Sequence, residues 1–170
     1  MIRRVAFKKA VIAGAAGAFA WEAVVRILLI LGVPLSDNVK MVGTMLTGHA
    51  GPIAWWPVGM ALHVMVGAIW AIFYAYFFWS TFNWAPVTQG LVFSLGPAVL
   101  AGFIMIPQMG YMHPLVQSGE LPFPGLFGLS FGWGGPAGDF IGHFAYGITL
   151  GSIYQRPVGY PAARTTLPYA

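Results

Sequence analysis

The chain contains no cysteine and very few charges: only 7% of its 170 residues are Asp, Glu, Lys or Arg. The absence of cysteine excludes disulfides, thiolate zinc sites and iron–sulfur clusters. An ordinary soluble domain has about 25% charged residues, so this chain has too few to cover a water-exposed surface. Together with a hydrophobic content of 58%, the composition indicates an integral membrane protein.

Four windows of the sequence are apolar enough to cross a hydrocarbon core about 30 Å thick, which takes about 20 residues of helix. They lie near 10–33, 54–80, 87–107 and 137–155. The predicted fold class is therefore all-α, with residues 1–170 forming a single domain that is a four-transmembrane-helix bundle.

The basic residues predict the orientation, because short cytoplasmic loops are enriched in Lys and Arg. Most of them lie near the two ends of the sequence: Arg3, Arg4, Lys8, Lys9, Arg156 and Arg164. Both termini are therefore expected in the cytoplasm, with the loops near 34–53 and 108–136 on the outer side and a tight inner turn at 81–86. We expect the inner membrane of a bacterial or archaeal cell, with lipids and no nucleic acid as partners.

A short pattern occurs twice at identical spacing: His63-x3-Gly67-x6-Tyr74 and His143-x3-Gly147-x6-Tyr154. Ionisable side chains within a membrane span are costly and usually face the bundle interior or a cavity. The pattern therefore predicts that His63 and His143 share one internal site. It also suggests a 2+2 internal repeat, in which the first two spans correspond to the last two.

Two further charged residues lie inside the first span, one helical turn apart: Glu22 and Arg26. At this spacing they share a helix face and can neutralise each other. We expect Glu22, Arg26, His63 and His143 to form a buried polar cluster.

Several interpretations of the two histidines remain open. His63 and His143 are candidate ligands of a tetrapyrrole, either haem or chlorin, in an electron-transfer or pigment protein. With Glu22 they are also candidates for a proton-handling or metal-handling site in a small channel or transporter. A third interpretation needs no cofactor, because neutral histidines can simply hydrogen-bond and set the helix register.

The sequence contains no phosphate-binding loop, no G-x-S-x-G elbow and no HExxH motif. We therefore expect no enzyme activity, and we assign neither a catalytic residue nor a metal ligand.

The outer segment 108–138 is rich in proline and glycine but also carries many apolar side chains. A disordered linker would be polar. Aromatic side chains in such a segment are typical of interface centres, so the candidate partner-binding residues are Phe123, Phe127, Phe131 and Trp133. Another subunit, lipid headgroups or the protein's own helices would cover them.

The pair Trp21-Glu22 in a glycine-rich first span and the closing sequence HFAYGITLGSIY at 143–154 resemble a group of small, uncharacterised four-helix membrane proteins of bacteria and archaea. The resemblance implies a four-helix bundle and carries no activity and no site. The function that we expect is a non-catalytic accessory or structural subunit of a larger membrane assembly, such as a respiratory or photosynthetic complex, or a homo-oligomer.

Overall fold

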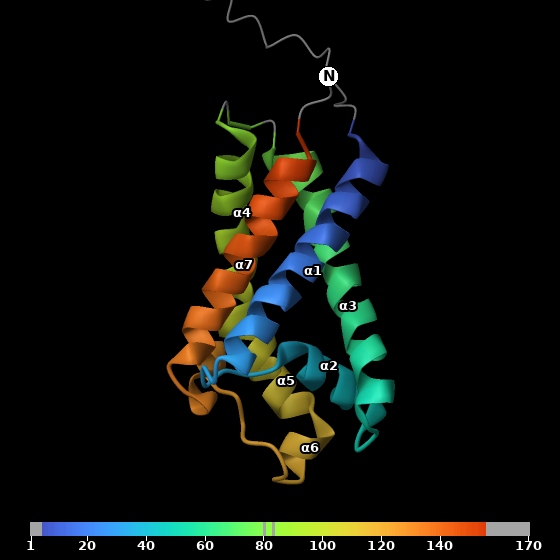
Figure 1. Ribbon diagram of the computed structural model, residues 1–170, viewed down its shortest axis with the longest axis vertical. Coiled ribbons are helices and arrows are strands. Elements are labelled where there is room, and N and C mark those ends of the chain that lie inside the picture. The colour runs from blue at the N-terminus through green and yellow to red at the C-terminus, as the bar shows by residue number, and fades with distance from the viewer. Residues whose placement is uncertain (1–4, 80, 83, 156–170) are drawn as a thin grey trace, which may run out of the picture.

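The computed structural model describes residues 5–79, 81–82 and 84–155, and this part of the chain is helical without a β-strand (Figure 1). Its four long helices are α1 (Phe7–Ile30), α3 (Pro52–Phe73), α4 (Pro86–Leu100) and α7 (Gly134–Ile153). Two of them continue as π-helix, namely α3 through η1 (Tyr74–Phe78) and α4 through η2 (Ala101–Met105), which leads into α5 (Ile106–Met112). The all-helical class expected from composition is confirmed for these residues.

Within the described residues, three helical segments are long and apolar enough to cross a membrane: Phe7–Ile30, Pro52–Phe78 and Pro86–Met112. Their apolar length indicates a membrane protein. The remaining long helix, α7, has 20 residues and lies alongside the other three (Figure 1). Its many glycines, together with Asp139 and His143, make it less apolar, so length and composition support three of the four expected spans.

The long helices pack in the order α3, α1, α7, α4. α1 contacts both α3 and α7, and α7 contacts α4 (Figure 1). α4 also reaches the π-helical end of α3, where the Phe93 ring lies 5.1 Å from that of Tyr74. Along the rest of their lengths α3 and α4 are not packed against each other. The cavity described in the next subsection lies between them.

Glycines allow the closest helix contacts. A Cβ atom added at Gly14 of α1 would collide with the Gly67 carbonyl oxygen of α3, and one added at Gly90 of α4 would collide with that of Gly147 in α7. Lipid tails provide no hydrophobic drive for helix association, so such close packing is the main source of attraction. Gly67 and Gly147 are corresponding positions of the repeated pattern, which thus contributes to two similar contacts.

The segment 34–53 is expected to be a loop, and here the structure differs. It contains the short helix α2 (Asn38–Thr47), whose N-terminus is capped by Asp37: the Lys40 backbone N–H donates to Asp37 Oδ1 at 2.9 Å. α2 packs on the start of α3, where Gly43 lies against the Trp55 backbone. Ten residues are too few to cross a bilayer, so a search for spans overlooks such a helix.

The segment 108–136 is also more regular than expected. The helix that begins with α4 continues as α5 to Met112, five residues beyond the expected end at 107, and is followed by α6 (Pro114–Gln117) and the 3-10 segment η3 (Leu126–Phe131). At η3 the regular geometry is broken, since Phe127 has a φ of 52°. After α5 the segment contains only these short helical pieces until α7 begins.

His113 connects this segment to α2. The side chain is completely buried, and its Nδ1 accepts a hydrogen bond from the Leu115 backbone N–H at 3.2 Å. In the neutral ring the proton therefore lies on Nε2, which donates to the Met41 carbonyl oxygen at 3.0 Å and lies 3.1 Å from Thr44 Oγ1. Sequence analysis assigned no role to this histidine, and the structure gives it a structural one.

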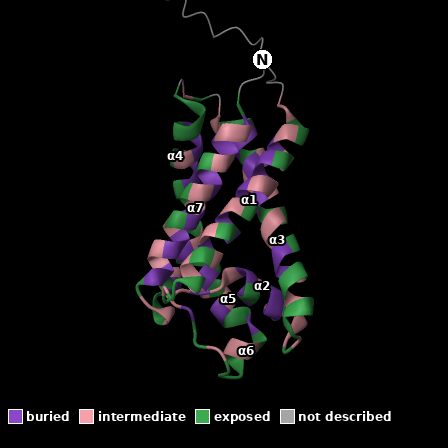
Figure 2. Ribbon diagram, viewed as in Figure 1, coloured by how far each residue is buried: buried purple, intermediate pink, exposed green. Residues whose placement is uncertain are grey.

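The outer faces of the long helices carry many exposed apolar side chains, whereas buried residues gather where the helices face one another (Figure 2). The start of α1 and the end of α7 lie at the same end of the bundle, and Lys9 Nζ donates to the Gln155 carbonyl oxygen at 3.1 Å. Four of the basic residues used to predict orientation lie outside the described residues: Arg3, Arg4, Arg156 and Arg164.

Candidate functional site

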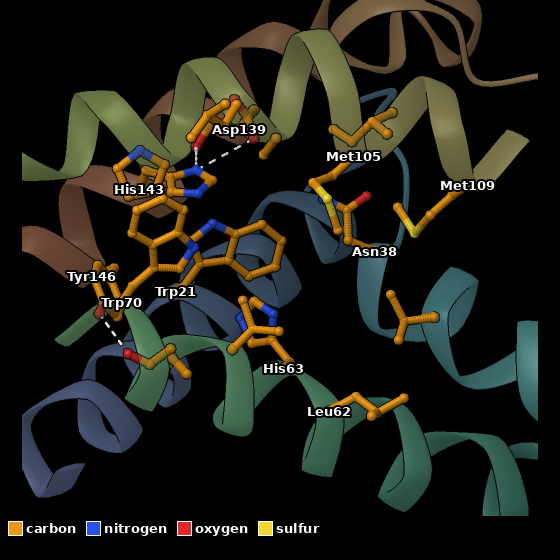
Figure 3. A pocket seen from close by; sticks show the side chains of 18 of the residues that line it. Trp21, Asn38, Leu62, His63, Trp70, Met105, Met109, Asp139, His143 and Tyr146 are labelled. Atoms are coloured by element: carbon orange, nitrogen blue, oxygen red, sulfur yellow. Dashed lines mark hydrogen bonds and ion pairs between the residues drawn. The ribbon is translucent and has the colours of Figure 1, made fainter. Parts of the chain in front are cut away.

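A cavity of about 330 Å³ lies between α3 on one side and α4, η2 and α5 on the other, with α1 and α7 forming its floor (Figure 3). Its size is at the lower end of the usual range for small-molecule pockets. Three lining residues are more than a third exposed: Val66 (43%), Leu100 (40%) and Met105 (53%). All three belong to apolar segments long enough to span a membrane, so we infer that the cavity opens sideways, toward lipid.

The two ends of the cavity are closed. Near η1, the Phe93 ring lies 6.1 Å from Trp70 and 5.4 Å from Phe78, forming an aromatic plug between α3 and α4. At the opposite end, Val42 and Met45 of α2 reach the cavity. The unexpected helix α2 therefore forms one end of the pocket between α3 and α4.

Both histidines of the repeated pattern line this cavity and contact the same indole ring. The Trp21 ring lies 4.7 Å from the His63 ring and 6.3 Å from the His143 ring, and Figure 3 shows Trp21 between them. The indole packs on the backbone of α7 at Gly142, where an added Cβ would lie 2.7 Å from its Cδ1 atom. The space between the two imidazoles is therefore occupied by Trp21.

His143 is held by Asp139, one turn earlier in α7. Its Nδ1 lies 2.8 Å from the Asp139 carbonyl oxygen, and since a carbonyl only accepts, Nδ1 carries a proton. The carboxyl oxygen Oδ1 of Asp139 is 3.3 Å from the same nitrogen. Neither carboxyl oxygen has a well-aligned hydrogen-bond donor among the described residues.

Several other buried polar atoms around the cavity also lack a hydrogen-bond partner within the described part of the chain. They are Trp21 Nε1, His63 Nε2 and Asn38 Oδ1, in addition to both carboxyl oxygens of Asp139. Trp21 and Asp139 are each only 3% exposed. An unpaired buried polar group costs about 1–3 kcal/mol. These atoms have almost no accessible surface, so they lie beneath the wall of the cavity and not on it.

Glu22 and Arg26 form a separate polar group at the end of α1. Arg26 Nε pairs with Glu22, and its Nη2 lies 2.7 Å from Oδ1 of Asp37, the cap of α2. Among the described residues no hydrogen bond or ion pair joins Glu22 to His63 or His143. The Arg26 network thus positions α2, which closes one end of the cavity.

The candidate partner-binding residues differ in their surroundings. Phe127 packs inward, with ring distances of 4.8 Å to Phe103 and 5.7 Å to Phe140. Phe123 is 38% exposed and lies 4.8 Å from the ring of the exposed Tyr111. Phe131 is half-buried, whereas Trp133 is 68% exposed. Besides Trp133, the outward apolar side chains of η3 are Leu126 and Leu129.

Asp139, Asn38 and Trp21 are site residues to which sequence analysis gave no role. Asp139 had a usable signal, because it precedes His143 by four residues and therefore shares its helix face. Asn38 had no such signal, since it belongs to the short helix α2, which no periodic sequence pattern predicted. Within the described ranges, no cluster of three or more His, Asp or Glu side chains could hold a metal ion.

Comparisons with known proteins do not extend this description. No protein-family model matches the chain, and neither the curated proteins nor the solved structures show a significant match. The interpretation of the site therefore rests on its own geometry and chemistry.

Proposed function

We propose that this protein is a non-enzymatic integral membrane protein that binds an apolar molecule from the bilayer in the cavity between α3 and α4. The carrying observation is an almost entirely apolar pocket between two segments that are apolar and long enough to span a membrane. An apolar lining favours the binding of an apolar molecule over the conduction of ions, because conduction would need a continuous polar path.

The proposed topology has α7 as a fourth span and both termini in the cytoplasm of a bacterial or archaeal cell. Two observations support it. α7 lies between α1 and α4, and the contact between Lys9 and Gln155 brings the beginning of α1 and the end of α7 to the same side. The similar contacts made by Gly67 and Gly147 support an internal repeat of two spans plus two.

A tetrapyrrole is one candidate ligand, and the geometry limits how it would bind. A ring ligated by both histidines would have to replace the Trp21 indole, which contacts both imidazoles. Either histidine could serve as a single axial ligand: the proton on His143 Nδ1 leaves the lone pair on its Nε2 in the neutral ring, and His63 Nε2 has no partner among the described residues. An absorption spectrum of the purified protein, oxidised and reduced, tests for a haem or chlorin directly.

The cavity proposal can be tested with an apolar photoreactive probe, adamantyl diazirine, added to membranes that contain the protein. Wild type should be labelled at lining residues that are not in the exposed class, such as Leu62 and Met109. The variant Ala101→Phe fills the cavity from η2 and should lose this labelling. The matched control Val99→Phe adds the same ring on the outward face of the same helix, since Val99 is exposed and does not line the cavity.

Equal labelling of the two phenylalanine variants would contradict the proposal, because the added ring would then not compete with the probe. Labelling restricted to exposed lipid-facing positions in the wild type would also contradict it.

A second candidate function is that of an accessory subunit of a larger membrane assembly, and one observation favours it. Leu126, Leu129 and Trp133 lie close together in the chain and are exposed by 48%, 55% and 68%, and exposed apolar patches commonly mark interaction sites. The double variant Leu129→Ser/Trp133→Ser should be lost from a larger complex in native gels of mildly solubilised membranes. Wild type that migrates alone as a monomer would contradict this assignment.

A further inference from the structure

The cavity occupies mainly one half of the depth of the membrane-spanning segments. The two spans that border it have Met65 and Val99 as their middle residues. Trp70 lies a little beyond the middle of its span, whereas Met109 lies far from the middle of the other span, towards the end where α2 packs (Figure 3). With each span centred in a hydrocarbon core about 30 Å thick and a rise of about 1.5 Å per residue, the cavity covers about the depth of one leaflet.

The cavity is narrow for its length. The lining residues run from Leu62 to Trp70 along α3 and from Pro97 to Met109 along the facing helix, which are stretches of about 12 Å and about 18 Å. A volume of about 330 Å³ over such a length leaves a mean cross-section of roughly 20–30 Å². Because non-bonded carbon atoms in contact lie about 3.5–4.0 Å apart, a slot this narrow admits one unbranched hydrocarbon chain and not two chains side by side.

The lining is poorly suited to a polar headgroup. The unpaired atoms of His63, Asn38 and Asp139 have almost no accessible surface, and the Tyr146 hydroxyl already donates to the Gly67 carbonyl oxygen at 2.7 Å. A polar headgroup in the cavity would therefore lose its water without gaining equivalent partners. The part of the ligand that enters the cavity should be hydrocarbon.

We propose that the cavity holds one unbranched acyl chain of a membrane phospholipid from the leaflet on the α2 side, with the methyl end of the chain near Trp70. Met105 and Met109 line the slot, and their flexible thioether side chains can adapt to such a chain. The headgroup and the second chain remain in the bilayer. This inference rests on the proposed function, since it names the ligand class of the same cavity.

The proposal has a consequence for selectivity. A headgroup that never enters the cavity cannot be recognised there, so lipids with the same chains and different headgroups should bind alike. Methyl branches widen a chain, and forcing a wider group into a filled space is an overpacked contact, which is destabilising. The protein should therefore select lipids by the shape of the chain.

The test uses the full-length protein in nanodiscs made from an equal mixture of two phosphatidylcholines, one with palmitoyl and oleoyl chains and one with methyl-branched phytanoyl chains. The protein is released from the nanodiscs in a native mass spectrometer, and the lipid that stays bound is identified by its mass. Wild type should retain one phospholipid and prefer the unbranched one at least about tenfold, which is the effect of one overpacked contact.

A second mixture contains phosphatidylcholine and phosphatidylglycerol with the same palmitoyl and oleoyl chains, and the two lipids should be retained about equally. The variant Ala101→Phe, which fills the cavity, should lose the retained lipid. Its matched control Val99→Phe should keep it, since Val99 is exposed and does not line the cavity. Both mixtures are tested on wild type, so they decide the proposal even if Ala101→Phe fails to fold.

Each result has a definite meaning. Equal retention of the branched and unbranched lipids, or equal retention by the two phenylalanine variants, would overturn the proposal and place the lipid on the outer surface of the bundle. A strong headgroup preference, or a retained free fatty acid in place of a phospholipid, would overturn it as well. If adamantyl diazirine labels Leu62 and Met109 but no chain preference is found, the acyl-chain inference fails while the proposed function stands. Failure of both experiments would remove the binding function itself.

Discussion

Replacing Gly147 with alanine should push α7 away from α4 and destabilise the bundle. A Cβ atom at this position would lie 2.7 Å from Ser94 Oγ and 2.8 Å from Ser94 Cβ, and it would also press on the Gly90 carbonyl oxygen. A backbone carbonyl cannot rotate away as a side chain can, so the helices themselves must separate. The main attraction between helices in lipid is close packing, which is lost at this contact.

The magnitude follows from two opposing terms. Overpacking a tight contact usually costs about 1–3 kcal/mol, whereas alanine in place of glycine inside a helix gains up to about 1 kcal/mol. The free energy of unfolding of Gly147→Ala should therefore fall by about 1–2 kcal/mol. Gly138→Ala in the same helix is the control: its nearest neighbour is Leu35 Cδ2 at 3.3 Å, the end of a side chain that can move. It should be neutral or slightly stabilising.

Both variants can be unfolded with increasing SDS in mixed micelles and followed by circular dichroism. The comparison within one helix removes the contribution of helix propensity, since both variants replace glycine with alanine. If Gly147→Ala is as stable as Gly138→Ala, the backbone contact between α4 and α7 does not exist as described, and the packing argument for the repeated pattern is wrong.

Three other outcomes are expected. His113→Ala should lower the free energy of unfolding by about 1–3 kcal/mol through lost buried hydrogen bonds, whereas His49→Ala should change it by less than about 0.5 kcal/mol; SDS unfolding distinguishes them. Arg26→Met should cost about 1–3 kcal/mol by leaving Glu22 without its charge partner, and exposed Lys40→Met should cost much less. Protease added outside intact cells should cut a site inserted after Ser118 and spare tags at both termini; cleavage of either tag refutes the orientation.

Composition and spacing were sufficient to predict the class of fold. Within lipid every backbone polar group must be satisfied inside the protein, so long apolar segments have to be helices. This constraint does not depend on which helices pack together. It explains why, among the described residues, three helices long and apolar enough to span a membrane lie where the sequence indicates them. The positions of α2 and α5 were missed, because α2 depends on the Asp37 cap and on contacts with α3, which a search for long apolar windows does not detect.

The repeated spacing drew attention to His63 and His143. Gly67 lies one helical turn after His63, and Gly147 lies one turn after His143. What the spacing did not show is that Trp21 lies between the two histidines. That placement decides how many imidazoles remain available to a ligand, and it follows from the packing of α1 against both α3 and α7.

The sequence by itself therefore indicated a membrane protein of the all-helical class and the small residues that bring its helices close together. These properties follow from local hydrophobicity and from the spacing of residues along a helix. The cavity, its lateral mouth and the unpaired polar atoms at Asp139 and Trp21 were decided only by the tertiary structure. Trp21 and His143 are far apart along the chain, and whether they meet depends on which helix faces pack together. No local pattern of residues specifies that choice.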